Sequence, residues 1–242
     1  MANTADEANS RGGDAHEDLM THAYHRLRDL LVWGRLAPGV RIVEKEVAVR
    51  LGISRTPLRA ALQRLQQEGY IDAVARGRQT RWVVTPLTED DAHELFSIVG
   101  AVEGLAAAGA ARRPAPARRE VVEELTELNE ALREVSRADR PDRNVVFDLD
   151  MEFHRRYVEL AGRSRVRVLH QAIKPQAERY VRLYIGALVD EIHESVEEHA
   201  LIIHEIERGD PAAAKRAVES NWYNAAERLG GVIRDLGERG NW

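Results

Sequence analysis

Residues 51–71 constrain the fold of this chain more than any other stretch, because they describe a tight turn followed by a helix with two different faces. At about 100° per residue, one arc of the helix is apolar and carries Leu58, Ala61, Leu62 and Leu65. A separate arc carries hydrogen-bonding side chains, namely Arg55, Arg59, Gln63 and Gln66, with Thr56 and Gln67 at its flank. A helix of this kind fits the major groove of DNA. An ordinary amphipathic helix with a solvated basic side would show the same pattern.

The segments around this helix favour the first interpretation. A short helical pattern over 43–51 is followed by Gly52-Ile53-Ser54, so two helices flank a turn that contains glycine, as in a helix-turn-helix. Ser54 is placed to cap the second helix, and a further amphipathic helix is expected over 16–33. Two strand-like runs, 70–74 and 81–84, enclose a basic turn. These elements predict a winged helix-turn-helix over residues 16–84.

The distribution of charge agrees with a polyanion as the partner of this part alone. Residues 17–87 hold 12 Lys and Arg against 7 Asp and Glu, a net charge of +5, whereas residues 88–242 hold 22 against 30, a net charge of −8. The whole chain carries a net charge of −5, so its overall balance hides the basic module. A basic module joined to an acidic one is typical of a protein that binds nucleic acid through one domain.

The run from Arg35 to Ile71 resembles the DNA-binding domain of the GntR superfamily of bacterial transcription regulators. The matching elements follow in order: Gly34-Arg35-Leu36-Ala37-Pro38-Gly39, then LGISRTPLR at 51–59, EGYI at 68–71 and a wing with Arg-Gly. The resemblance implies that DNA is contacted by Lys45, Ser54, Arg55, Thr56 and Arg59, and by a wing of Arg76, Gly77 and Arg78 in the minor groove. Ala60 stands where the family usually carries Glu, which removes a local ion pair.

Length and composition limit what the rest of the molecule can be. A chain of 242 residues has room for two domains of roughly 70 and 150 residues. The chain has no cysteine, and no apolar run in it approaches the ~18 residues that a membrane span needs. Residues 1–15 are small, polar and acidic and are predicted to be a disordered tail, and 85–88 a linker. We therefore expect a cytoplasmic protein that does not enter a membrane.

The second part is predicted to be helical throughout. Helix starts and breaks predict helices over 88–112, 115–137, 143–161, 164–188, 190–209 and 211–233. Thr88 and Asp210 are placed as caps, and Pro211 occupies the first turn of the last helix. Six helices with short links predict an antiparallel bundle over 89–235, followed by a C-terminal tail at 236–242.

Four polar residues of this bundle are predicted to face its apolar interior. Asp150 and His154 lie on the inward arc of helix 143–161, His199 on that of helix 190–209, and Asn221 on that of the last helix. A buried carboxylate beside imidazoles needs compensation, either from a core hydrogen-bond network or from a metal ion. Periodicity alone leaves both explanations open.

The same residues carry a second resemblance. Asp150-Met151-Glu152-Phe153-His154 matches the D-x-x-F-H motif of the FCD effector domain of the FadR subfamily of GntR regulators, and Glu198-His199 matches its second signature. The resemblance covers roughly 88–235 and implies a divalent metal held by Asp150, His154, His199 and a fourth ligand, with a small carboxylate bound beside it. Asn221 stands where the family has His. Because an amide oxygen is a harder and weaker ligand, zinc, nickel and manganese are all compatible.

Three further positions bear on the effector. Val99 stands where the family commonly has an Arg that holds a ligand carboxylate. Arg228, projected near Asn221, is a candidate substitute, and Tyr157 on the inward arc is a second candidate contact. An arginine that snorkels from the end of the bundle is the alternative. Glu103 matches the family's Glu and is expected to pair inside the bundle.

Together these features predict a dimeric, ligand-responsive transcription regulator, a repressor rather than an activator, that binds a palindromic operator in double-stranded DNA. Its effector would be a small organic acid beside the metal. Two rivals remain: a metal-free regulator that binds an apolar or acyl ligand, and a metalloenzyme. The enzyme needs a general base close to the metal, and no second inward carboxylate or nucleophile lies nearby in the sequence, so we expect no enzyme activity.

Overall fold

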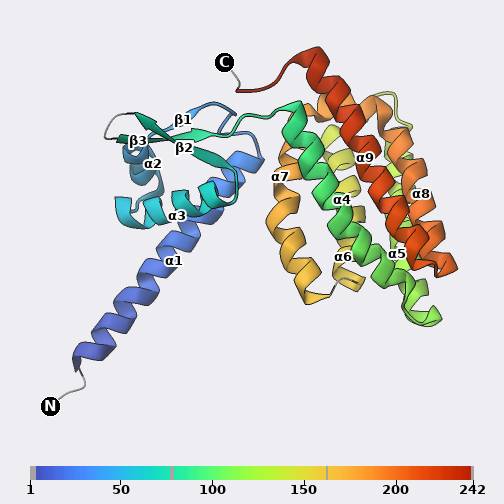
Figure 1. Ribbon diagram of the computed structural model, residues 1–242, viewed down its shortest axis with the longest axis horizontal. Coiled ribbons are helices and arrows are strands. Elements are labelled where there is room, and N and C mark those ends of the chain that lie inside the picture. The colour runs from blue at the N-terminus through green and yellow to red at the C-terminus, as the bar shows by residue number, and fades with distance from the viewer. Residues whose placement is uncertain (1–3, 77–78, 162, 241–242) are drawn as a thin grey trace. The chain divides into compact units, whose positions relative to one another are not determined.

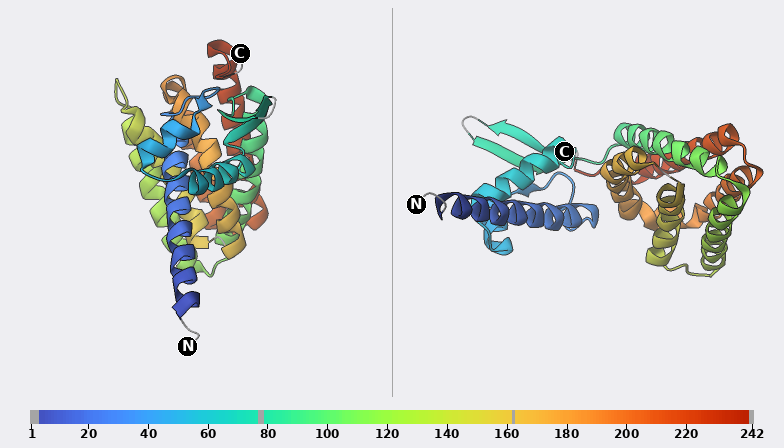
Figure 2. Two further views of the ribbon diagram at one scale, coloured as in Figure 1. Left: turned by 90° about the vertical axis from the view of Figure 1, so that its left-hand side faces the viewer. Right: turned by 90° about the horizontal axis from the view of Figure 1, so that it is seen from below.

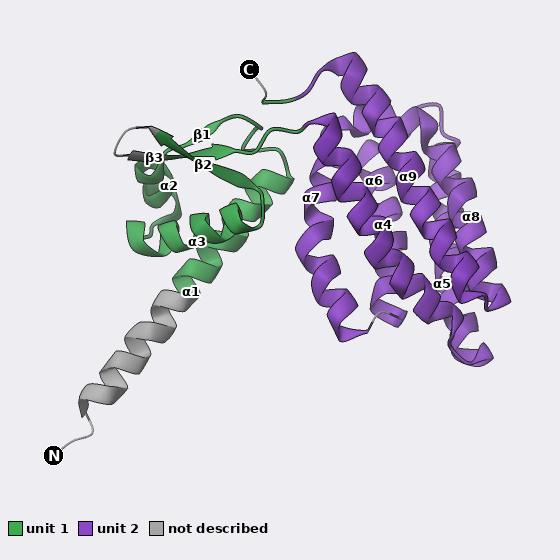
Figure 3. Cartoon of the chain, in the orientation of Figure 1, with its two compact units in different colours: residues 1–87, 239–242 green, residues 88–238 purple. Residues whose placement is uncertain are grey.

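The computed structural model describes residues 4–76, 79–161 and 163–240 (Figure 1), and for residues 4–17, 76, 79 and 80 it describes the backbone alone. The chain divides into two compact units (Figure 3). Unit 1 comprises residues 1–87 and 239–242, and unit 2 comprises residues 88–238. The boundary between Leu87 and Thr88 falls inside the segment expected to be a linker.

Unit 1 is a winged helix-turn-helix, as the sequence predicts. Its helices are α1 (Thr4–Val32), α2 (Glu44–Leu51) and α3 (Arg55–Gln67), and its strands are β1 (Arg41–Ile42), β2 (Ile71–Arg76) and β3 (Gln79–Val84). The strands form one antiparallel sheet in the order β1-β3-β2. In its register, Ile71 lies opposite Val84 and Ile42 lies opposite Trp82. The two-residue strand β1 is an element that the sequence pattern does not predict.

The apolar arc of the two-faced helix α3 forms the centre of this unit. Leu58, Ala61, Leu62 and Leu65 are fully buried, and they pack with Leu27 and Leu31 of α1 and with Ile71 and Val84 of the sheet. Burying each large aliphatic side chain contributes about 1.5–3 kcal/mol. The opposite arc, with Arg55, Arg59, Gln63 and Gln66, is exposed. The division of α3 into two faces is therefore confirmed.

Two local expectations for unit 1 differ from the structure. Helix α1 begins at Thr4, so of the tail expected to be disordered only residues 1–3 lie outside the described part of the chain. Extending a packed helix costs less than nucleating one, which lets residues without an apolar face join α1. Ser54 occupies the N-cap position of α3 with an extended backbone but makes no side-chain cap hydrogen bond. Solvent can satisfy the exposed N–H groups of such a helix end.

The C-terminal segment belongs to unit 1 although it follows the last helix of unit 2. The N–H of Leu87 donates to the carbonyl of Arg239 at 2.9 Å, and the N–H of Arg239 donates to the carbonyl of Leu87 at 3.1 Å. Gly39 and Gly240 allow a close approach of two backbones here, because a Cβ at Gly39 would lie 2.7 Å from the Cα of Gly240. Part of the predicted tail is therefore paired with the predicted linker.

Unit 2 is the predicted helical bundle. In the described part of the chain it contains α4 (Glu89–Ala111), α5 (Ala115–Ser136), α6 (Arg143–Ala161), α7 (Ser164–Leu188), the 3₁₀ turn η1 (Val189–Glu191), α8 (Ile192–Arg208) and α9 (Pro211–Leu236). Helix α4 runs along α9, as Figures 1 and 2 show in green and red, and α5 packs on both α6 and α8. Nearly all predicted helix bounds agree within a few residues. The helix expected to begin at Asp190 begins instead with η1.

Side-chain caps fix the first residues of α4 and α9, the two helices with the most extensive contact in the bundle. Oγ1 of Thr88 accepts a hydrogen bond from the N–H of Asp91 at 3.2 Å at the start of α4. Oδ1 of Asp210 accepts from the N–H groups of Ala212 and Ala213, both at 3.0 Å, at the start of α9. Both predicted caps are confirmed.

Among the described residues, α4 is the one helix long and apolar enough by length and composition to cross a membrane. Of its most apolar stretch, 61% is buried inside unit 2. Core helices of folded bundles show the same composition.

Candidate metal centre and nucleic-acid surface

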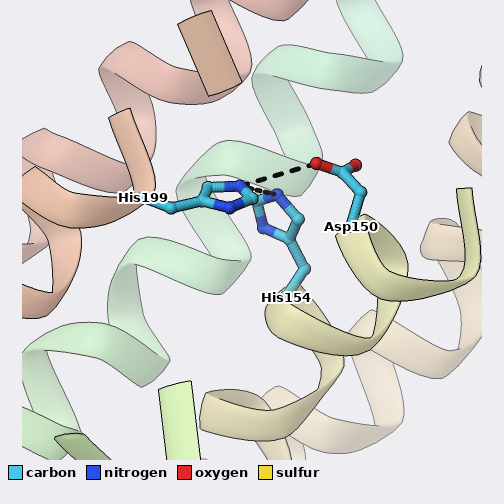
Figure 4. A group of neighbouring side chains, drawn as sticks. All are labelled: Asp150, His154 and His199. Carbon is cyan, nitrogen blue, oxygen red and sulfur yellow. Dashed lines mark hydrogen bonds and ion pairs between the residues drawn. The ribbon is translucent and has the colours of Figure 1, made fainter. Parts of the chain in front are cut away.

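Asp150, His154 and His199 come together in the interior of unit 2 (Figure 4). Nε2 of His199 lies 3.3 Å from Nε2 of His154 and 3.6 Å from Oδ1 of Asp150. Both histidines are buried, and 15% of the Asp150 side chain is exposed. Three of the four predicted metal-ligating side chains thus meet at one point.

Helix geometry and ring stacking bring the side chains of Asp150, His154 and His199 together. Asp150 and His154 are one turn apart on α6, so they share its inward face. The ring of Phe153 stacks on the ring of His199, with centroids 3.8 Å apart and planes 8° apart. This contact holds the imidazole of His199, on α8, against α6. The D-x-x-F-H motif therefore supplies two polar groups and the aromatic face that orients a third.

The spacing of the three polar atoms suits one divalent metal ion. Ligands at the usual bond lengths around a tetrahedral zinc lie about 3.4 Å apart, and the distances found here are 3.3 and 3.6 Å. Burial lowers the pKa of His199 well below its ordinary value, so the ring is neutral and offers a lone pair at neutral pH. Burial raises the pKa of Asp150. In addition, Nδ1 of His199 has no hydrogen-bond partner among the described groups. A metal bound through Nε2 would leave this atom equally unpaired, so it does not distinguish the metal from a purely hydrogen-bonded cluster.

A buried carboxylate orients one of the two histidines. Glu103 on α4 is fully buried, and its Oε2 lies 2.8 Å from Nδ1 of His154. The carboxylate can only accept hydrogen bonds, so Nδ1 carries the hydrogen and Nε2 faces the cluster with its lone pair. A carboxylate behind a metal-binding histidine commonly fixes its tautomer and orientation in this way.

The carboxylate of Glu103 accepts hydrogen bonds from side chains on three other helices. Besides His154, these are Tyr157 at 2.6 Å, His170 at 2.8 Å, Lys174 at 3.1 Å and Trp222 at 2.8 Å. Burial by itself would raise the pKa of this carboxyl, but Lys174 and His154 hold it well below its usual range. Glu103 is therefore ionised, and the expectation that it pairs inside the bundle is confirmed.

His170 and Lys174 are functional candidates that the sequence reasoning missed. Both are almost completely buried on α7. Their spacing of four residues, continued by the buried Ala177 and Tyr184, places them on one inward stripe of that helix. The same search for polar residues on apolar arcs that identified His154 and His199 would have found them.

The predicted fourth ligand and the predicted carboxylate clamp belong to a second network at the edge of this site. Nδ2 of Asn221 donates to Oε2 of Glu198 at 2.7 Å. The guanidinium of Arg228 donates to both oxygens of Glu198, at 2.9 and 3.1 Å, and to Glu194 at 3.2 Å. Asn221 and Arg228 therefore lie close to each other, as expected, and share one carboxylate.

A pocket with a volume of about 50 Å³ opens beside the cluster. Its polar lining includes Asp150, His154, Asn221 and Arg228, and its apolar lining comes chiefly from α6, α7 and α9. Tyr157, the other candidate effector contact, does not line this pocket; it is buried and donates to Glu103.

A second concave surface lies in unit 1, between the exposed arc of α3 and the sheet. The groove is lined chiefly by long polar side chains: Arg41, Glu44, Lys45, Arg55, Arg59, Gln63, Gln66 and Arg81. Five of these side chains are cationic, as a phosphate-binding surface requires. Lys45, Arg55 and Arg59 were predicted to contact DNA. Arg41 and Arg81 were not, because only the folded sheet brings β1 and β3 beside α3.

Arg59 is held by an acidic neighbour. Its Nε donates to Oε2 of Glu44 at 2.8 Å, and Nε1 of Trp82 donates to Oε1 of the same carboxylate at 3.1 Å. The two terminal nitrogens of Arg59 are not used by this contact. Arg59 itself remains well exposed, with 61% of its side chain accessible.

The remaining predicted DNA contacts are placed as follows. Ser54 and Thr56 are exposed at the start of α3. Arg76 ends β2, where the backbone alone is described, and Gly77 and Arg78 lie outside the described residues.

Comparison with known proteins matches both units. The gntR family of bacterial regulatory proteins matches residues 19–80, and the FCD domain matches residues 94–222. An uncharacterised HTH-type transcriptional regulator of Agrobacterium vitis, from the TAR-I ttuE-ttuC' intergenic region, is 30% identical over 66% of this chain and 91% of that protein. A probable D-xylose utilization operon transcriptional repressor of Paenarthrobacter nicotinovorans is 29% identical over 80% of this chain and 82% of the relative.

Among solved structures, E. coli McbR/YncC has a similar fold. It superposes with a TM-score of 0.64 over 87% of this chain and 96% of that one, at 21% sequence identity.

Proposed function

Because the chain belongs to the GntR family of bacterial regulatory proteins and carries an FCD domain, we propose that it is a cytoplasmic repressor that binds a palindromic operator as a homodimer. The protein is a transcription regulator and not an enzyme. A repressor role is supported by the similarity to the probable xylose-operon repressor. The observation that carries the DNA-binding part is the cationic groove beside α3.

In the proposed complex, α3 enters the major groove. Arg55 and Arg59 contact base edges or phosphates from its exposed arc, while Lys45, Ser54 and Thr56 contact the backbone beside it. The wing residues Arg76, Gly77 and Arg78 reach the adjacent minor groove. Gel-shift titration with a palindromic operator, at fixed salt, tests this docking. Loss of operator preference on replacing residues of α3 is expected, and full affinity in such variants would refute it.

A homodimer is supported by the outer face of α4. Ile98, Ala101 and Leu105 form an exposed apolar stripe, with Ile98 and Leu105 42% and 52% accessible. Arg216 and Glu219 lie on the neighbouring face of α9. An isologous interface can pair such opposite charges across its two-fold axis, so we propose a second copy of this chain as the occupant.

Light scattering after size exclusion tests the dimer. Leu105→Glu is expected to give monomers, because it places a charge on the proposed interface. Leu201→Glu is the control, since Leu201 is equally exposed on α8, away from that stripe. Dimers of unchanged stability in Leu105→Glu would refute this interface.

The effector site is proposed at the Asp150–His154–His199 cluster. These three side chains would hold a divalent metal, zinc, nickel or manganese, with Asn221 as a weak fourth ligand. The metal would supply the positive charge that attracts a small organic acid. Asp150 and His154 line the pocket, and Glu103 keeps the imidazole of His154 oriented. Binding shifts DNA affinity only as far as the acid prefers one of the two conformations of the dimer.

Metal analysis of the purified protein tests this site. We expect one divalent ion per chain, lost in His154→Ala and in His199→Ala but retained in His204→Ala, whose ring is exposed on α8. The pocket's largely apolar lining also supports a second candidate, a metal-free regulator with an apolar ligand. A protein that binds no metal and yet responds to an apolar ligand would favour that alternative.

A further inference from the structure

The pocket beside the Asp150–His154–His199 cluster has a lining of two chemical kinds. The polar part includes Asp150, His154 and Asn221. The apolar part is larger and includes Phe96, Phe147, Met151, Val181, Ile185 and Leu188. A ligand that fills this pocket therefore needs one polar head and an apolar body.

Two polar side chains of the lining, Arg228 and Asn221, already donate hydrogen bonds to Glu198. Arg228 donates to Glu198 and Glu194, and also to Oγ of Ser195 at 3.3 Å. Asn221 donates its amide N–H to Glu198. A hydroxyl on the ligand body would lose its hydrogen bonds to water and meet apolar side chains instead, which is costly.

Charge at the pocket excludes a second anionic group. Arg228 is the one cation among the described lining residues, and Glu194 and Glu198 both pair with it. Glu191 adds a further carboxylate to the lining. The surroundings of Arg228 thus carry an excess of negative charge. A second ligand carboxylate placed there would be repelled.

Resting on the proposed function, we propose that the effector is a monocarboxylic acid with a short, unsubstituted apolar body. Its carboxylate lies at the cluster, and its hydrocarbon part lies against Val181, Ile185 and Leu188. A volume of about 50 Å³ holds roughly three to five water-sized groups, which fits an aliphatic body of a few carbons. Dicarboxylates and polyhydroxylated sugar acids are excluded by charge and by desolvation, respectively. Arg228 accordingly orders Glu198 and Asn221 and does not clamp a second carboxylate.

Three acids with the same carbon chain test the proposal: butanoate, butanedioate and 2,3,4-trihydroxybutanoate. Calorimetric titration of the metal-loaded full chain is expected to show butanoate binding at least tenfold more tightly than either of the others. Equal or tighter binding of the dicarboxylate or of the trihydroxy acid would overturn the proposal. So would the failure of butanoate and of its branched homologue 3-methylbutanoate to bind.

Variants of the apolar lining give an independent readout. Ala225→Leu fills the pocket from α9 and is expected to weaken butanoate binding at least tenfold. Ala212→Leu makes the same change at an exposed position of α9 and is expected to have no effect. The isosteric Val181→Thr, which adds a hydroxyl without changing the volume, is expected to weaken binding too. Unchanged butanoate affinity in Ala225→Leu and Val181→Thr would overturn the placement of the body.

Operator release separates this proposal from the proposed function. If butanedioate or the trihydroxy acid, and not butanoate, changes operator affinity in a manner that requires His154, the regulator stands and the ligand class proposed here is wrong. If the protein shows no preference for any palindromic DNA, the proposed function itself fails.

Discussion

Oε2 of Glu103 lies 2.8 Å from Nδ1 of His154, and this contact turns the other nitrogen of the ring toward His199. The carboxylate is fully buried and also neutralises Lys174, which is itself buried. One side chain therefore connects the stability of the bundle to the geometry of the candidate metal centre. The two roles can be separated by experiment.

Glu103→Gln keeps the shape of the side chain but removes its charge. The change leaves Lys174 without a counter-charge and places an amide N–H₂ among groups that donate. Breaking a buried ion pair by removing one partner typically costs about 3–5 kcal/mol. Thermal or denaturant unfolding of the apo protein measures this cost. Metal affinity is expected to fall about 10–100-fold, as for other groups that orient a metal-binding histidine.

The matched control is Glu130→Gln on α5, where the side chain is exposed and pairs with Arg133. Surface pairs of this kind contribute at most about 1 kcal/mol. A Glu103→Gln protein that is destabilised but binds metal as tightly as the wild type would show that Glu103 has a structural role alone.

Asn221→His tests whether the side chain at this position ligates the metal. An imidazole at this position would replace an amide that now donates to Glu198. Imidazole is the stronger ligand for zinc and nickel, so metal affinity, measured by competition with a chelator, is expected to rise at least tenfold. Asn224→His is the control, because Asn224 also donates to Glu198 but is exposed. Equal affinities in the two variants would place Asn221 outside the coordination sphere.

Arg59→Ala is expected to weaken operator binding and to leave unit 2 folded. A bidentate contact from Arg to a guanine contributes about 1–3 kcal/mol of discrimination, so the preference for operator over random DNA should fall roughly 5–150-fold. Arg26→Ala removes an equal charge from α1, outside the groove, and serves as the control. Operator preference that is reduced as much by Arg26→Ala as by Arg59→Ala would argue against base contact by Arg59.

Glu44→Gln tests whether the contact that holds Arg59 contributes to specificity. Glu44 is the one acidic residue among the described lining of the groove. Its neutralisation frees Arg59 and removes a charge that repels phosphate, so affinity for random DNA should rise while the preference for the operator falls. Both quantities come from competition gel shifts at fixed salt. An unchanged ratio of the two affinities would mean that Arg59 needs no such partner.

Asp210→Asn tests the cap of the helix that carries Asn221. The N–H groups of Ala213 and Ala212 lower the pKa of Asp210 below its ordinary value of 3.8. A carboxyl with a lowered folded-state pKa contributes stability above that ordinary value and loses it as the pH falls through the folded-state pKa. Asparagine also caps but does not titrate. The wild type should therefore have a higher melting temperature than Asp210→Asn at pH 7. This difference in melting temperature should vanish in strong acid. A constant difference across that range would contradict this account.

The predictions from sequence were best where they depended on neighbours along one helix. The arcs of α3, the caps at Thr88 and Asp210, and the spacing of Asp150 and His154 all follow from the helical period and from cap chemistry. These relations span only a few residues and do not depend on what packs against them. The predicted cap at Ser54 was wrong because solvent competes for an exposed helix end.

Relations between distant elements were beyond that reasoning. The gathering of Tyr157, His170, Lys174 and Trp222 around Glu103 joins residues up to 119 positions apart and depends on how each helix is rotated in the bundle. The pairing of Arg59 with Glu44 likewise requires the turn that brings α2 against α3. The sequence by itself determined which faces are apolar and which residues have metal-binding chemistry, because local periodicity sets both. Only the tertiary structure decided which polar groups meet, since rotation and register between packed helices are set by side-chain packing over the whole unit.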